Sequence, residues 1–166
     1  MKTLTSASAG KLIRQLEDEK EHLLSHELDT YTYVLAKDEK AEPPAYAYAE
    51  TRAKIDAIDA KVRTLRHALH SFNMETVLPE SNMTIDEALI LMAQLNNKRN
   101  RLDLLRSTLP MVREHTRYSS NLIEYRYANF DVTAAQTDYD AVTEAINDLQ
   151  LKIDLCNQTV TFEVDL

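Results

Sequence analysis

The sequence predicts a mainly α-helical protein with minor β structure, an antiparallel helical bundle made of two repeated helical-hairpin units, each followed by a short strand. Over long segments, apolar residues recur every three or four positions, which is the period of one helix face. The 166 residues include one glycine and four prolines, so we expect few tight turns and a small number of long elements.

The first two helices are predicted at about residues 6–25 and 46–71. The two prolines at 43–44 prevent the second helix from starting earlier. Apolar side chains at helical spacing are Leu12, Ile13, Leu16, Leu23 and Leu24 in the first segment, and Ile55, Ile58, Val62, Leu65, Leu69 and Phe72 in the second. The residues after each helix, at 30–34 and 72–78, have the pattern of short strands.

The third helix is predicted to begin at Thr84, because Thr84 and Glu87 have the spacing of a capping box. Pro110 is expected to end or bend this helix near residue 109. Two arginines, Arg99 and Arg106, interrupt its apolar stripe. The apolar members of the stripe are Ile85, Ala88, Met92, Leu95, Leu102 and Leu109.

The fourth helix is predicted at about residues 132–156, with Asp131 or Thr133 as its cap. Its apolar residues are spaced alternately by three and four, as in coiled coils and bundles: Val132, Ala135, Tyr139, Val142, Ile146, Leu149, Ile153 and Cys156. Alternation at 122–127 and 160–166 predicts two further strands. Isolated strands are unstable, so we expect the short strands to pair with each other or with another subunit.

We expect a single domain over residues 1–166, with a pseudo-repeat of residues 1–80 and 81–166. Two sets of matching residues support a duplication. Leu4, Thr5, Leu12, Ile13 and Leu16 correspond to Met83, Thr84, Leu91, Met92 and Leu95, and Val62, Leu65, Leu69, Phe72 and Asn73 correspond to Ile146, Leu149, Ile153, Cys156 and Asn157. The alternative is that any two pairs of amphipathic helices resemble each other to this extent.

The net charge of −8 argues against nucleic-acid binding. Charge is also distributed unevenly along the second half. Residues 98–126 contain seven basic and three acidic side chains, whereas residues 131–166 contain one basic and eight acidic ones. We therefore expect the third and fourth helices to form an antiparallel pair with complementary flanks.

The sequence points to the cytoplasm. The single cysteine, Cys156, excludes an internal disulfide and fits a reducing compartment. The first residues lack the apolar core of a signal peptide, and no segment approaches the roughly 18 consecutive apolar residues of a transmembrane helix. We expect no membrane partner.

Arg99 and Arg106 are the most unusual residues of the predicted core, because a buried arginine is costly unless it is paired. We favour a structural role, in which they form ion pairs within the chain or between subunits. The expected partners are acids of the fourth helix, such as Asp138, Glu144 or Asp148. The functional alternative is an anion site. Together, the candidate residues for an anion or inter-subunit site are Arg99, Arg106, Arg117 and Tyr118.

Other polar residues give weaker signals. The pairs His22/His26 and His67/His70 have spacings that can hold a metal, but we interpret them as solvated side chains and expect no metal and no cofactor. Cys156 is interpreted as a packed hydrophobic residue rather than a nucleophile. The tyrosines cluster around the two inter-helix segments, where they suit either an interface or strand positions: Tyr31, Tyr33, Tyr46 and Tyr48, then Tyr118, Tyr125 and Tyr127.

Several short motifs occur in the order found in the septicolysin-like family of small bacterial proteins. They are Leu69-x-x-Phe72-Asn73-x-x-Thr76, Thr84-x-x-Glu87-Ala88-Leu89, the run from Asn97 to Arg106, Arg117-Tyr118-Ser119, and the helix end at Asn157 with the Thr-rich strand after it. The chain resembles this family over most of its length. The resemblance implies a small, helical, oligomeric protein whose role is not established, and the family name suggests a cytolysin.

The sequence favours a non-enzymatic, self-assembling helical protein, a homo-oligomer that presents a surface to a protein partner. Long apolar stripes, unpaired strands and tyrosine-rich segments support this expectation. One alternative is a membrane-active, cytolysin-like protein, which only the family name suggests. Another alternative is a ligand or anion binder that uses the charged residues of the bundle.

Overall fold

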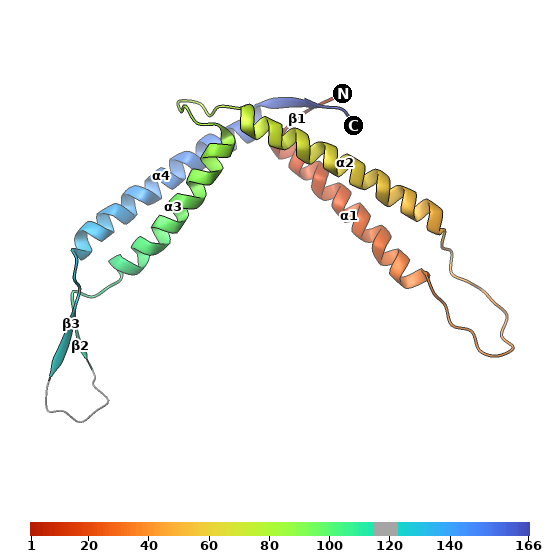
Figure 1. Cartoon of the computed structure of the whole chain (residues 1–166), viewed down its shortest axis with the longest axis horizontal. Helices are drawn as coiled ribbons and strands as arrows, with labels where there is room; N and C mark the ends of the chain where they lie inside the picture. The colour runs from red at the N-terminus through yellow and green to blue at the C-terminus, as the bar shows by residue number, and fades with distance from the viewer. Residues whose placement is uncertain (115–122) are drawn as a thin grey trace. The chain divides into compact units, whose positions relative to one another are not determined.

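The structure, a computed structural model, describes residues 1–114 and 123–166 and confirms the predicted fold class. Four helices form paired hairpins with small antiparallel two-stranded sheets (Figure 1). The helices are α1 (Ser6–Thr30), α2 (Tyr48–Glu75), α3 (Ile85–Arg106) and α4 (Val132–Thr159), and the strands are β1 (Lys2–Thr5), β2 (Met111–Glu114), β3 (Glu124–Tyr127) and β4 (Thr161–Val164). The chain divides into two compact units, residues 1–76 with 155–166 and residues 77–154.

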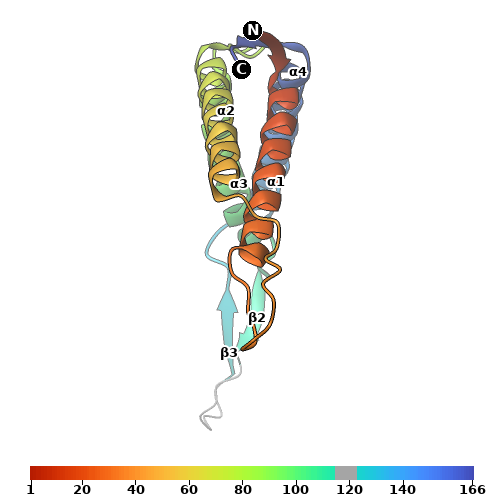
Figure 2. The same cartoon turned by 90° about the vertical axis from the view of Figure 1, so that its right-hand side faces the viewer.

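The first unit is built on the antiparallel pair of α1 and α2, which lie side by side in Figure 2. Its core consists of the buried residues Ile13, Leu65 and Val164. Partly buried apolar side chains pack around this core: Leu4, Leu12, Leu16, Val62, Ala68, Leu69 and Phe162. An ion pair between Lys20 and Asp59, with an N–O distance of 2.7 Å, connects the two helices at their flank.

The two ends of the chain meet in the sheet of the first unit. Strand β1 pairs antiparallel with β4, and the register places Leu4 opposite Phe162. The Phe162 ring lies 4.9 Å from the ring of Phe72 in α2, measured between centroids. The C-terminal strand is therefore fixed both by backbone hydrogen bonds to β1 and by apolar contact with α2.

The second unit is built on α3 and α4, and its core consists of Leu102, Val142 and Ile146. Met92, Leu95, Leu105 and Tyr139 pack against these residues. The predicted antiparallel pairing of the two helices is confirmed. The predicted ion pairs between their charged flanks do not form. Within the described residues, no ion pair connects α3 with α4. Apolar burial and the contacts of Arg106 with α4 therefore hold this helix pair together.

Side-chain caps define where α1, α3 and α4 begin, whereas α2 begins after Ala47 without a side-chain cap. The predicted capping box at α3 is confirmed, because the Thr84 amide donates to the Glu87 carboxylate (2.8 Å) and the Glu87 amide donates to Thr84 Oγ1 (3.2 Å). Thr5 and Ser8 form a corresponding box at α1. At α4, Asp131 is the cap, since its carboxylate accepts from the Thr133 amide at 2.8 Å.

Several strand predictions were wrong. No strand forms at 30–34, because α1 continues to Thr30 and the Tyr31 amide still donates to the Glu27 carbonyl at 2.9 Å. Most of 72–78 is helical, since Phe72 continues the buried face of α2, and only Val77 forms a bridge, with Thr84.

Two strands of the fold were not predicted. Strands β1 and β2 are short, and each pairs with a strand that lies later in the chain. The expectation at 122–127 is confirmed for β3, whereas residue 122 lies outside the described residues. The expectation at 160–166 is confirmed for β4.

The two halves bury corresponding residues. Ala9 in α1 and Ala88 in α3 have no exposed surface, and each follows its capping threonine by the same number of residues. Leu65 and Leu149 are also both buried, as are Phe72 and Cys156. This agreement fits a duplication, which stays a prediction.

Within the described part of the chain, no helix combines the length and apolarity that crossing a bilayer requires.

Candidate functional site

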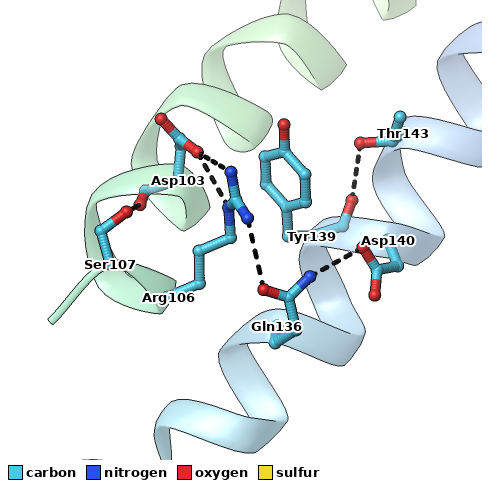
Figure 3. Close-up of polar contacts among 7 residues, drawn as sticks. All are labelled: Asp103, Arg106, Ser107, Gln136, Tyr139, Asp140 and Thr143. Atoms are coloured by element: carbon cyan, nitrogen blue, oxygen red, sulfur yellow. Dashed lines mark hydrogen bonds and ion pairs between the residues drawn. The ribbon is translucent and has the colours of Figure 1, made fainter. Parts of the chain in front are cut away.

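Arg106, in the last turn of α3, contacts three groups (Figure 3). Its Nε and Nη2 atoms donate to Asp103 Oδ1 at 2.8 and 2.6 Å. Its Nη1 atom lies 3.4 Å from Gln136 Oε1, and its Cζ atom lies 3.9 Å from the centre of the Tyr139 ring. The guanidinium therefore connects α3 with α4 through an amide and an aromatic face.

The residues around Arg106 are themselves held in place. Gln136 Nε2 donates to Asp140 Oδ1 at 2.8 Å, which orients the amide oxygen toward the arginine. Ser107 Oγ donates to the Asp103 carbonyl at 2.7 Å in the last turn of α3. Hydrogen bonding to Asp103 raises the pKa of Arg106, against the opposing effect of desolvation. The arginine is therefore a fixed cation near a helix C-terminus, where a positive charge is favourable.

The structure corrects the predicted pairing of Arg106. Its partner acid is Asp103 of the same helix and not Asp138, Glu144 or Asp148 of α4. The side chain is 32% exposed, so it does not form a buried ion pair. The i, i+3 spacing makes Asp103 the nearest carboxylate. With a carboxylate, an amide oxygen and a ring already around it, this guanidinium is better suited to joining helices than to capturing an anion.

The structure does not assemble the four candidate residues into one site. Arg99 lies half-buried in α3, in the turns before Arg106. Arg117 and Tyr118 lie outside the described residues. The cluster instead contains Gln136 and Tyr139 of α4, together with Asp103 of α3. No pattern in the sequence indicates this combination, because it depends on the register of α3 against α4.

Among residues 1–114 and 123–166, the histidines and the cysteine belong to no group of three or more side chains that could hold a metal ion. His22 and His26 are exposed on α1, and His67 and His70 are exposed on α2. Cys156 is buried, and desolvation raises the pKa of its thiol. A buried thiol with a raised pKa carries little thiolate at neutral pH, so it packs as a small apolar residue.

The tyrosines of the first unit gather where α1 ends and α2 begins. Tyr31 caps the end of α1, and Tyr48 is the first residue of α2. The Tyr46 hydroxyl donates to the Glu27 carboxylate, and this hydrogen bond raises the pKa of Tyr46 to about 12. Since no strand forms at 30–34, the interpretation of these tyrosines as strand residues was wrong. In the second unit, Tyr125 and Tyr127 do lie in a strand, β3.

We predict that Tyr46 titrates at a pKa of about 12, above the ordinary value of about 10. The ionised Glu27 carboxylate accepts a hydrogen bond only from the protonated phenol, so folding favours that form. The resulting stability is fully present below about pH 10 and is lost as the pH rises through about 12. The measurement is an absorbance titration of tyrosinate, compared with Tyr46→Phe and with the control Tyr127→Phe.

In Tyr46→Phe, the rise in tyrosinate absorbance at the highest pH should disappear. In Tyr127→Phe, that rise should remain. Subtracting the Tyr46→Phe titration from that of the wild type gives the titration of Tyr46 alone. A midpoint at the ordinary tyrosine pKa would contradict the hydrogen bond to Glu27. Circular dichroism over the same pH range checks that the helices remain folded.

Comparison with known proteins identifies a shared fold and no family. No protein-family model matches the chain, and no curated protein matches it. A crystal structure of a protein from Corynebacterium diphtheriae, described as functionally unknown and conserved, is similar with a TM-score of 0.68. The two chains are 19% identical, and the similarity covers 98% of this chain and 100% of that one. At this identity the likeness shows that the two proteins have the same fold.

Proposed function

We propose that this chain is a non-enzymatic helical protein that assembles with further copies of itself and presents a surface to a partner protein. The observation that carries this proposal is the apolar surface of α3. Ile85 and Ala88 of its first turns are buried, yet Leu89 and Ile90 are 45% and 55% exposed. A helix that is apolar on all sides is normally buried on all sides.

The exposed side of α3 fits a contact between subunits. Because an α-helix has 3.6 residues per turn, Ile90 lies nearly opposite the buried Ala88, and Leu89 lies at the flank of the buried face. Leu104, about four turns further along the helix, is 73% exposed. Burying one such side chain contributes about 1.5–3 kcal/mol, so a few of them are enough to stabilise a dimer.

Four side chains of the described residues have a pKa shifted from the ordinary value, and none of the four is suited to acid–base chemistry at neutral pH. Neighbouring carboxylates raise the pKa of Arg106 and of Lys152. Glu27 raises the pKa of Tyr46, and burial raises that of Cys156. Each shift moves the group further from neutral pH, whereas a general acid or base needs a pKa near its working pH.

Membership of the septicolysin-like family is part of this proposal. The motif Thr84-x-x-Glu87 forms the capping box of α3, and Asn157 lies in the last turn of α4. The order of the motifs along the chain and the small helical fold support the assignment. The family resemblance adds the expectation of an oligomer, which the next experiment tests.

We predict that the wild-type chain is an oligomer in solution, so that its measured mass is at least twice the 19.0 kDa of one chain. In Ile90→Lys, a charge would enter the contact, and we expect at least tenfold weaker association, because about 1.4 kcal/mol corresponds to a factor of ten. The matched control is Val34→Lys, which places the same charge at a side chain that is 96% exposed in the segment between α1 and α2.

Light scattering on a sizing column, at two protein concentrations, measures both variants. The proposal expects an oligomer for the wild type and for Val34→Lys, and a shift toward the monomer for Ile90→Lys. A wild-type monomer at both concentrations would exclude self-assembly. If the wild type and both variants are oligomers of equal mass, the contact between subunits does not lie on α3.

A further inference from the structure

A pocket of about 450 Å³ lies at the end of the α1–α2 pair, where the segment that connects the two helices begins and ends. Its lining consists of three aromatic rings, one carboxylate and one aliphatic side chain: Tyr31, Tyr46, Tyr48, Glu27 and Leu28. Glu27 and Leu28 belong to the last turn of α1, whereas Tyr46 and Tyr48 lie at the start of α2. The pocket thus combines residues that are distant in the sequence.

The rings of this pocket are accessible and one of them is fixed. Tyr31 and Tyr48 are 60% and 61% exposed, so their faces are open to a ligand. Tyr46 is half-buried, and its hydrogen bond to Glu27 holds the ring in place. The face of an aromatic ring carries negative potential and attracts a cation within about 6 Å of its centre.

Negative charge at this end of α1 is not compensated. Glu27 and Asp29 lie in the last turns, and the last turn of α1 contains no basic side chain. In the part of the chain that the structure describes, no Lys or Arg pairs with Glu27. A helix C-terminus already carries partial negative charge, so acidic residues there cost stability. A bound cation would remove this cost.

We propose that this pocket binds a trimethylammonium group. Three aromatic rings and an aliphatic wall suit a cation that is covered by methyl groups and donates no hydrogen bonds, whereas a primary ammonium needs several acceptors. Glu27 supplies the counter-charge. This site lies in the first unit and does not depend on the proposed contact through α3.

The test uses choline and its neutral carbon isostere, in which a tert-butyl group replaces trimethylammonium. The chain has no tryptophan, so its emission comes from its eight tyrosines, and three of these line the pocket. We expect choline to bind and the isostere to bind at least fivefold more weakly. Tyr48→Leu should weaken choline binding about two- to fivefold, since a cation–π contact at an exposed ring contributes about 0.5–1 kcal/mol.

Two further variants separate this site from general effects of tyrosine. Glu27→Gln removes the counter-charge and should also weaken choline binding, while Tyr127→Leu alters an exposed tyrosine of β3 and should leave it unchanged. Equal affinity for choline and the isostere, or equal loss in Tyr48→Leu and Tyr127→Leu, would overturn the proposal.

The trimethylammonium group can belong to a free solute or to a lipid headgroup. Vesicles of phosphatidylcholine, with phosphatidylglycerol vesicles as the control, distinguish these sources. Choline binding without vesicle binding assigns the site to a solute. Selective binding to phosphatidylcholine that free choline reverses assigns it to the headgroup. Absence of binding to both choline and phosphatidylcholine would refute the site.

Discussion

Replacing Leu65 with alanine will lower the free energy of unfolding of the first unit by about 2–5 kcal/mol. Leu65 has no exposed surface and packs with Ile13 and Val164, which come from α1 and β4. The shorter side chain would lose apolar burial and leave a cavity where three elements meet. Because the core of this unit is small, the surrounding side chains have few ways to fill the space.

Urea denaturation followed by circular dichroism measures this effect. The matched control is Leu28→Ala, which removes the same atoms from a side chain of α1 that is 72% exposed. The control should change the unfolding free energy by no more than about 0.5 kcal/mol. Similar losses in Leu65→Ala and Leu28→Ala would show that Leu65 is not the centre of the core.

A second core variant examines whether the two compact units unfold independently. Leu102→Ala removes the same atoms from the core of the second unit, which contains Val142 and Ile146. If the two units unfold independently, urea denaturation shows two transitions and each variant shifts only one of them. If the chain unfolds in a single cooperative transition, both variants lower the same urea midpoint.

The helices could be predicted from the sequence because their signals are local. Leu65 and Ile146 were recognised by spacing alone, and both are buried. The capping box at Thr84 likewise involves residues that are three apart. A helix face repeats along one segment of chain, so neither its period nor its cap requires knowledge of a partner.

Strand pairing could not be predicted in the same way. Strand β1 is defined by its pairing with β4 at the opposite end of the chain, and its four residues show no alternation of their own. At Tyr31, helical hydrogen bonding extended beyond the point where alternation with threonine suggested a strand. Four-residue patterns are too short to decide between these structures.

The candidate site was predictable only in part. Arg106 stood out as a charged residue in an apolar stripe, and it does contact the opposite helix. Its contacts with Gln136 and Tyr139 depend on how far α3 is shifted along α4, which composition and spacing do not determine. The hydrogen bond of Tyr46 to Glu27 likewise depends on the path of the segment between α1 and α2.

Replacing Phe72 with alanine will lower the free energy of unfolding of the first unit by about 3–5 kcal/mol and loosen the sheet that joins the two chain ends. Phe72 is 6% exposed, and its ring contacts the ring of Phe162 in β4. In the part of the chain that the structure describes, strand β4 pairs with the four residues of β1 and with no other strand. A two-stranded sheet is marginal without packing on one face. Loss of the Phe72 ring removes that packing.

Amide hydrogen exchange measures the loosening of the sheet, with urea denaturation for global stability. In Phe72→Ala, the amides of Leu4 and Phe162 should exchange faster relative to those of the α1–α2 core. The matched control is Phe130→Ala, which truncates a phenylalanine that is 39% exposed before α4 and should cost less than about 1 kcal/mol.

A double-mutant cycle of Phe72→Ala with Phe162→Ala isolates the contact between the two rings. We expect a coupling energy of about 0.5–1.5 kcal/mol, as for other aromatic pairs. Additive losses, together with unchanged exchange at Leu4, would mean that backbone pairing and the burial of Val164, rather than the Phe72 ring, hold β4. A measurable coupling would mean that the C-terminal strand is anchored by α2, so that the first unit is completed only when the end of the chain returns to it.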